Sequence, residues 1–224
     1  MTSTAASSSS SSAGSIALSR DQSRTVFGQV MGLVALTLGF TALGAYIGRD
    51  LNGGIGIVFF LVALASIFGL SAASARGNEQ LAITLLFVVG LSLGLTLGPV
   101  LNAYAKADPA AVWQAAGATG GFVAALGAYG YTTRRDLSSW YRVLFGALLA
   151  LLVFGLVAIF ASIPHENVIW AVAGLVIFGG FTIFDFNRLR RTGQNEAVPI
   201  AASIFLDVLN VFQFFLLLFG GGRD

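Results

Sequence analysis

Long apolar runs, separated by short polar segments, dominate the chain after its first twenty residues. Each run approaches the roughly 20 residues that a helix needs to cross the hydrocarbon core of a bilayer. Apolar and polar positions do not alternate within the runs, so the pattern predicts helices and not the strands of a barrel. The predicted spans cover residues 25–47, 53–75, 81–103, 110–131, 140–162, 167–187 and 198–219. We therefore expect an all-α membrane protein with seven transmembrane helices.

Composition agrees with this pattern. The 224 residues are 56% hydrophobic and only 10% charged, with a net charge of +2 and no cysteine, and the mean hydropathy is +0.85, whereas a soluble domain is about 25% charged. The small net charge gives no reason to expect a nucleic-acid partner. A single histidine and the lack of cysteine argue against disulfides, thiolate chemistry and a His-rich metal site. We expect no cofactor, and the lipid bilayer is the expected environment.

The first residues differ from the rest. Residues 1–19 include an unbroken serine run at 7–12 and little apolar content, which predicts a disordered cytoplasmic tail. The segment lacks the basic-then-apolar layout of a signal peptide, so the first span is expected to be retained. Residues 20–224 then form the transmembrane domain.

Basic residues gather in alternate loops, and this asymmetry sets the predicted orientation. With the N-terminus inside, only Arg49, Lys106 and Arg223 lie on the outer side. The inner side holds Arg20, Arg24, Arg76, Arg134, Arg135, Arg142, Arg188, Arg190 and Arg191. We predict a multi-pass protein with a cytoplasmic N-terminus and an external C-terminus. The short loops favour a bacterial inner membrane, with the endoplasmic reticulum membrane as the alternative.

Glycines recur at four-residue spacing in several spans. Such pairs stand at 28 and 32, 44 and 48, 90, 94 and 98, and 117 and 121. Small residues one turn apart allow helix backbones to approach closely in lipid. With seven helices to pack, close packing within one chain is favoured over a dimerisation motif.

Two acidic residues lie inside the predicted spans, Asp185 and Asp207. A carboxylate near the bilayer centre costs at least about 3 kcal/mol, so such residues usually face the bundle interior and mark a functional path. Ser203, Asn210 and Gln213 share a helix face with Asp207 and form a supporting polar seam. Asp207 is therefore the stronger functional candidate.

Structural explanations stand beside the functional one. Asn210 and Ser203 could hold Asp207 only to fix helix packing, and Asp185 could be an interfacial acid paired with Arg188. A short loop joins the last two spans, so these are expected to be antiparallel neighbours that bring the two acids together. Two carboxylates in a poorly hydrated site share a proton, respond to pH and attract a cation.

Three stretches carry a resemblance to a known family. They are GATGG at 117–121 continuing to RRDLS at 134–138, FDFNRL at 184–189, and IFLDVLNVF at 204–212, the most specific of the three. Over residues 24–220 the chain resembles the transmembrane Bax-inhibitor-motif family, which has bacterial members. The resemblance implies a seven-helix bundle whose last helix is surrounded by the others.

The resemblance also implies a function. Members are described as pH-sensitive calcium leak channels, and the proton-sensing aspartate pair corresponds to Asp185 and Asp207. An arginine that ends the second span latches the cytoplasmic mouth in the family, and Arg76 takes that place here, counted back from GLTLGP at 94–99. Arg76 is followed by Gly-Asn-Glu, where relatives can have a basic run, so an ordinary positive-inside anchor is an equal alternative.

The sequence supports three functions unequally. The first is a cation leak, with calcium bound weakly and transiently by the two acids because two carboxylates are too few for a tight site. The second is a regulatory protein that binds a membrane-anchored AAA+ protease or another membrane partner, as some bacterial members of the similar family do. The third, intramembrane proteolysis, requires a Gly-x-Gly-Asp motif, whereas bulky Ile204, Phe205 and Leu206 precede Asp207. We therefore expect no enzyme.

Overall fold

The computed structural model describes residues 6–158, 166–193 and 196–220. This part of the chain folds into seven helices that follow the predicted spans closely. They are α1 (Ala6–Gly48), α2 (Gly53–Ala75), α3 (Glu79–Ala107), α4 (Pro109–Thr132), α5 (Trp140–Ala158), α6 (Glu166–Leu189) and α7 (Ala197–Gly220). The predicted end of the fifth span, at residue 162, lies outside the described residues.

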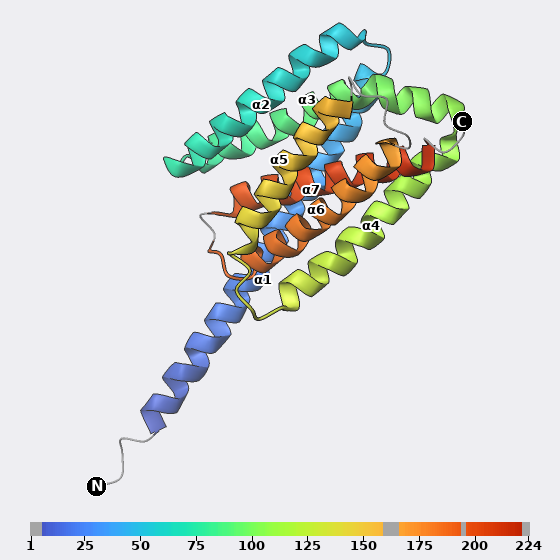
Figure 1. Ribbon diagram of the computed structural model, residues 1–224. Helices are drawn as coiled ribbons and strands as arrows, with labels where there is room; N and C mark the ends of the chain where they lie inside the picture. Colours follow the sequence, from blue (N-terminus) through green and yellow to red (C-terminus); the bar gives the residue numbers. More distant parts are fainter. Residues whose placement is uncertain (1–5, 159–165, 194–195, 221–224) are drawn as a thin grey trace.

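The first helix begins earlier than the sequence indicates. Residues 6–19 are helical and extend α1 away from the bundle (Figure 1), where we predicted a disordered tail; residues 1–5 lie outside the described residues. The apolar part of α1 starts only at Arg24. An established helix gains one hydrogen bond for each residue added, and alanine and serine oppose its extension only weakly.

Six of the seven helices are long and apolar enough to cross a membrane. The seventh, α4, is less apolar because it is rich in alanine and glycine, but it runs alongside the others in the bundle (Figure 1). The outer faces of α2 and α5 expose many Leu, Ile, Val and Phe side chains. Such a surface is stable only in contact with lipid, and the predicted seven-helix membrane bundle is confirmed.

The last helix is the centre of the bundle. α7 packs against α1, α2, α3, α4 and α6, and Figure 1 shows it running between them. Buried residues follow one another along nearly its whole length, from Ala197 to Leu216. The central position expected from the resemblance is therefore present.

Glycines set the closest helix contact, between α1 and α3. A Cβ added at Gly48 would lie 2.6 Å from the Leu95 carbonyl oxygen, and one added at Gly98 would lie 2.7 Å from the Ala45 carbonyl oxygen. The glycine spacing thus serves packing within the chain at this crossing, as predicted. The glycines at positions 28, 32, 117 and 121 make no such close contact, because an added Cβ there would meet no atom within 4 Å.

Candidate functional site

The two intramembrane acids meet at the contact between α6 and α7. Asp185 is 2% exposed and Asp207 is 4% exposed. Their carboxyl groups are close enough to form a hydrogen bond with each other when one of them is protonated. The structure therefore brings together the pair that the sequence predicted.

The pair is only partly satisfied by its surroundings. Within the described part of the chain, the hydroxyl of Ser203 is the side-chain donor to Asp185, and the Oδ2 atoms of both acids have no hydrogen-bond partner. Buried polar atoms are nearly always hydrogen-bonded, to water or an ion where protein groups do not suffice. Two orphaned carboxylate oxygens at one point therefore favour a small polar or cationic occupant there.

Two residues of the polar seam on α7, Asn210 and Ser203, have hydrogen-bond partners other than Asp207. The Nδ2 atom of Asn210 donates to the Leu206 carbonyl oxygen of its own helix at 2.7 Å, and Ser203 contacts Asp185. Neither of them holds Asp207. The explanation in which these two residues fix Asp207 purely for helix packing therefore does not apply, because their donors are used elsewhere.

Arg188 does not form an ion pair with Asp185. Its guanidinium Nη2 lies 2.8 Å from Oε2 of Glu196, although its positive charge still reaches Asp185 electrostatically. Asp185 is buried inside the bundle. The alternative of a simple surface ion pair is therefore wrong for Asp185, because the helix turn directs Arg188 towards the loop.

The predicted latch residue stands at the end of α2. Arg76 is the exposed residue that ends α2, and its backbone N–H donates to the carbonyl oxygens of Ala72 and Ala73. Among the described residues its side chain takes part in no ion pair. Among the described residues, neither Asp185 nor Asp207 has a hydrogen bond or ion pair with Arg76, so the latch stays a prediction.

Two cavities lie along α7, one before and one after Asp207 in the sequence. One, of about 500 Å³, is lined by Asp185, Ser203 and, from the α4–α5 loop, Ser138. The other, of about 280 Å³, is lined by Asn210 and Gln213. Asp207 lines neither cavity. Asp185 therefore borders the first cavity, and the second cavity lies against the part of α7 that follows Asp207 in the sequence.

The sequence did not reveal the role of Asn187. This buried side chain donates to three backbone carbonyl oxygens at the end of α4 and in the following loop, at 3.2, 2.9 and 3.3 Å. These acceptors belong to Gly130, Thr133 and Arg135. Asn187 and the loop residue Arg135 both lie in stretches that carry the family resemblance, and this was the sequence signal that could have pointed to the contact. Asn187 thus fixes the loop that borders the cavity below Asp185.

An ion pair reinforces the same loop. The Nη1 atom of Arg191 lies 2.8 Å from Oδ1 of Asp136, and the hydroxyl and backbone N–H of Ser138 donate to that oxygen at 2.6 and 2.9 Å. These hydrogen bonds from Ser138, and then the Arg191 charge, hold the pKa of Asp136 below its usual range.

The acidic pair offers two neighbouring carboxyl groups as possible metal ligands. The described residues contain no group of three or more His, Cys, Asp or Glu side chains that could hold a metal ion. A cation at this point would therefore have two carboxylates and neighbouring hydroxyl or carbonyl oxygens as ligands. Hard cations such as calcium take six to eight oxygen ligands when held tightly, so binding here would be weak.

Comparison with known proteins gives one consistent result. Residues 23–224 match the protein family described as "Inhibitor of apoptosis-promoting Bax1". An uncharacterized protein of Helicobacter pylori is 31% identical over 73% of this chain and 70% of its own length. The inner membrane protein YbhL of Escherichia coli is 28% identical over 89% of this chain and 93% of its own length. An uncharacterized membrane protein of Vibrio cholerae is 29% identical over 84% of this chain and 85% of its own.

Proposed function

The chain belongs to the Bax inhibitor-like family of membrane proteins, and from that membership and the site we propose that it is a pH-sensitive cation leak channel. Calcium is the proposed permeant ion, and the proposed gate is the Asp185–Asp207 pair. We further propose that it resides in a bacterial inner membrane, as YbhL does by its name, with the N-terminus in the cytoplasm.

One observation carries the proposal. Two buried acids touch each other, each keeps an oxygen without a partner among the described residues, and Asp185 lines a cavity of about 500 Å³. A purely structural carboxylate would be expected to have its oxygens satisfied, because an orphaned buried acceptor costs about 1–3 kcal/mol. If protons and a cation occupy the pair in turn, its carboxylate oxygens must stay free of hydrogen bonds from the protein.

The chemistry is a competition between protons and a cation. The shared proton holds the two carboxyl groups together, whereas a cation needs their ionised oxygens. Arg188 on α6 is the other charged group whose field reaches Asp185, and Ser203 on α7 is its neutral donor. Because protons and calcium would occupy the same oxygens, each must weaken the binding of the other by an equal factor.

The test measures calcium flux in liposomes as a function of pH. Wild-type protein should show pH-dependent flux, and the pH of half-maximal flux should move downwards as calcium concentration rises. Asp207→Asn and Asp185→Asn remove the shared proton while nearly conserving side-chain volume, so both should lose the pH dependence.

A matched control uses Asp50→Asn, which makes the same chemical change at an exposed acid beside Arg49. This variant should keep the wild-type pH response. An unchanged response in Asp207→Asn would overturn the proposal, and so would an equal loss in Asp50→Asn.

We assign no catalytic role to the pair. Ile204 and Phe205, which precede Asp207 closely in α7, are fully buried. An aspartyl protease needs room for a substrate backbone beside its acids, and these side chains occupy that room. The absence of enzymatic activity is therefore part of the proposal.

A regulatory role through a membrane-anchored AAA+ protease is the second candidate. It is favoured by the N-terminal part of α1, which extends beyond the bundle and offers a partner an accessible segment (Figure 1). Deleting residues 1–19 should then remove co-purified membrane proteins without changing calcium flux. Recovery of the same partners after the deletion would exclude this segment as the binding element.

A further inference from the structure

A third cavity, of about 1100 Å³, lies between α1 and α4. Val208 and Phe212 of α7 form its floor, and its lining is almost entirely apolar. Its volume slightly exceeds the range of about 300–1,000 Å³ found for ligand sites. Neither Asp185 nor Asp207 lines it, so this groove is separate from the proposed gate.

The packing of its two walls keeps the groove open. α1 is held on α3 by the close glycine contacts at their crossing. α4 is held on α6, because Gly130 abuts the Ile183 backbone and a Cβ added at Gly127 would lie 3.0 Å from the Phe186 ring. With each wall fixed to a different partner, α1 and α4 cannot approach to fill the space between them.

Small residues on α4 make the groove deep and accessible from the side of the bundle. Ala116, Gly120, Ala124 and Ala128 line it at four-residue spacing and are exposed. A Cβ added at Gly120 would meet no atom within 4 Å. The lining stretch of α4, residues 116–132, is roughly 24 Å long at 1.5 Å per residue. One leaflet contributes only about 15 Å of hydrocarbon, so an acyl chain fits along the groove.

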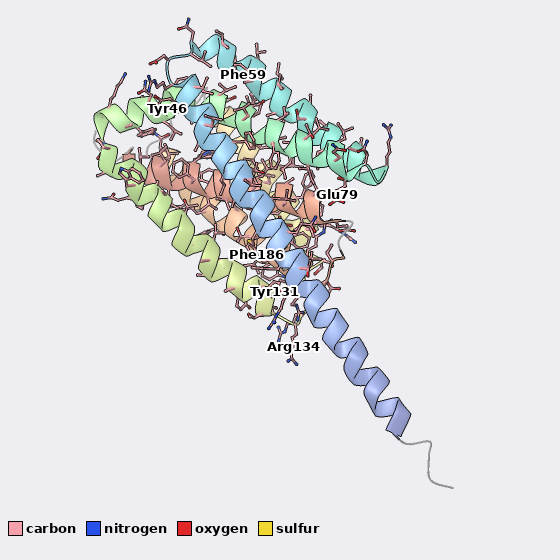
Figure 2. All side chains as sticks on the ribbon, turned by 180° about the vertical axis from the view of Figure 1, so that it is seen from behind. Tyr46, Phe59, Glu79, Tyr131, Arg134 and Phe186 are labelled. Atoms are coloured by element: carbon pink, nitrogen blue, oxygen red, sulfur yellow. The ribbon has the colours of Figure 1, made fainter. Side chains whose placement is uncertain are left out.

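Positive charge marks one end of the groove. Arg24 lines it there, close to the edge-to-face contact of the Phe27 and Tyr131 rings, whose centroids are 5.1 Å apart. Arg134 lies just beyond Tyr131 at the same end (Figure 2). Among the described residues neither Arg24 nor Arg134 forms an ion pair. The nearby acid Asp136 is paired with Arg191 and leaves these two charges available.

We infer that the α1–α4 groove binds an anionic glycerophospholipid, with one acyl chain between the helices and the phosphate at Arg24 and Arg134. Basic pockets between transmembrane helices bind acidic head groups in this manner. The apolar lining explains the chain and the two arginines explain the preference for negative charge. Binding to this groove does not depend on whether the protein conducts ions.

Native mass spectrometry of detergent-purified protein tests this inference. Phosphatidylglycerol and phosphatidylcholine with identical acyl chains serve as the two probes. Wild-type protein should bind one phosphatidylglycerol more tightly than phosphatidylcholine. Gly120→Leu fills the groove and should lose that bound lipid, whereas Gly121→Leu makes the same change one residue away, where the side chain does not line the groove, and should bind as wild type does.

Variants that remove one positive charge test lipid binding without adding a side chain to the groove. Arg24→Gln and Arg134→Gln should each weaken phosphatidylglycerol binding about fivefold and leave phosphatidylcholine binding unchanged. These substitutions are at exposed positions, so they decide the question even if Gly120→Leu fails to fold.

Three results would overturn the inference. Equal affinity of wild type for both lipids would mean that only ordinary surrounding lipid is bound. Unchanged binding by Gly120→Leu together with both arginine variants would place the lipid elsewhere. Loss of a dimer in Gly120→Leu, with lipid binding unaffected, would assign the groove to a second copy of the chain.

Discussion

Replacing Gly90 with alanine tests whether glycine contacts hold α1 on α3. Gly90 is buried in the middle of α3 and faces Thr37 of α1. An added Cβ would lie 2.7 Å from both the carbonyl oxygen and the Cγ2 atom of Thr37. Since ordinary contacts begin at about 3.5 Å, the two helices would have to separate by about 0.8 Å.

Thr37 cannot move aside easily. Its hydroxyl donates to the Leu33 carbonyl oxygen at 2.7 Å, and its own carbonyl oxygen accepts from the Thr41 hydroxyl at 2.9 Å. Overpacking of this kind costs about 1–3 kcal/mol. Alanine is also a better helix former than glycine by about 1 kcal/mol, which offsets part of that cost.

A matched variant cancels the propensity effect. Gly121→Ala gains the same helix propensity, but its Cβ would meet no atom within 4 Å. Gly90→Ala should therefore be less stable than Gly121→Ala by the overpacking cost alone, about 1–3 kcal/mol. Thermal unfolding in detergent micelles, followed by tryptophan fluorescence, measures the difference. Equal stability of the two variants would refute the reasoning that backbone contact at these glycines fixes α1.

Two further predictions concern the loop beside the acidic pair. Asn187→Ala leaves buried carbonyl oxygens without a donor and should lower the free energy of unfolding by about 1–3 kcal/mol, measured in the same assay; Asn187→Asp, which keeps the shape but loses the amide donors, should be no better. The lowered pKa of Asp136 means that its contacts with Ser138 and Arg191 persist at neutral pH and disappear only as pH falls below about 4. An NMR titration of the Ser138 amide would show this, and loss of the contact near pH 6 would contradict it.

Several features could be predicted without a structure because they depend on local properties. The positions of the spans follow from the length of apolar runs, since a helix satisfies its own backbone in lipid. Asp185 and Asp207 stood out because an intramembrane acid is expensive wherever it lies in the fold. Their proximity could be expected because a short loop joins the two helices that carry them, which makes those helices antiparallel neighbours. The family followed from three motifs and is confirmed by the match over residues 23–224.

Other features depended on which side chains meet across helices. Asn210 shares the helix face of Asp207, yet its amide turns to its own backbone, because a side-chain rotamer is chosen by the space around it. Arg188 is one turn from Asp185, yet it pairs with Glu196. Gly117 and Gly121 of α4 match the spacing that packs α1 on α3, but α4 uses other glycines for its contact with α6 and leaves these two open.

The sequence by itself determined the membrane class, the helices, the acidic pair and the family. Only the tertiary structure decided that the two acids keep unpartnered oxygens, that Asp185 lines a cavity, and that α1 and α4 enclose an apolar groove. The reason is physical. Hydrophobic length and the cost of a buried charge are properties of a segment, whereas cavities and hydrogen-bond partners arise where several segments pack against one another.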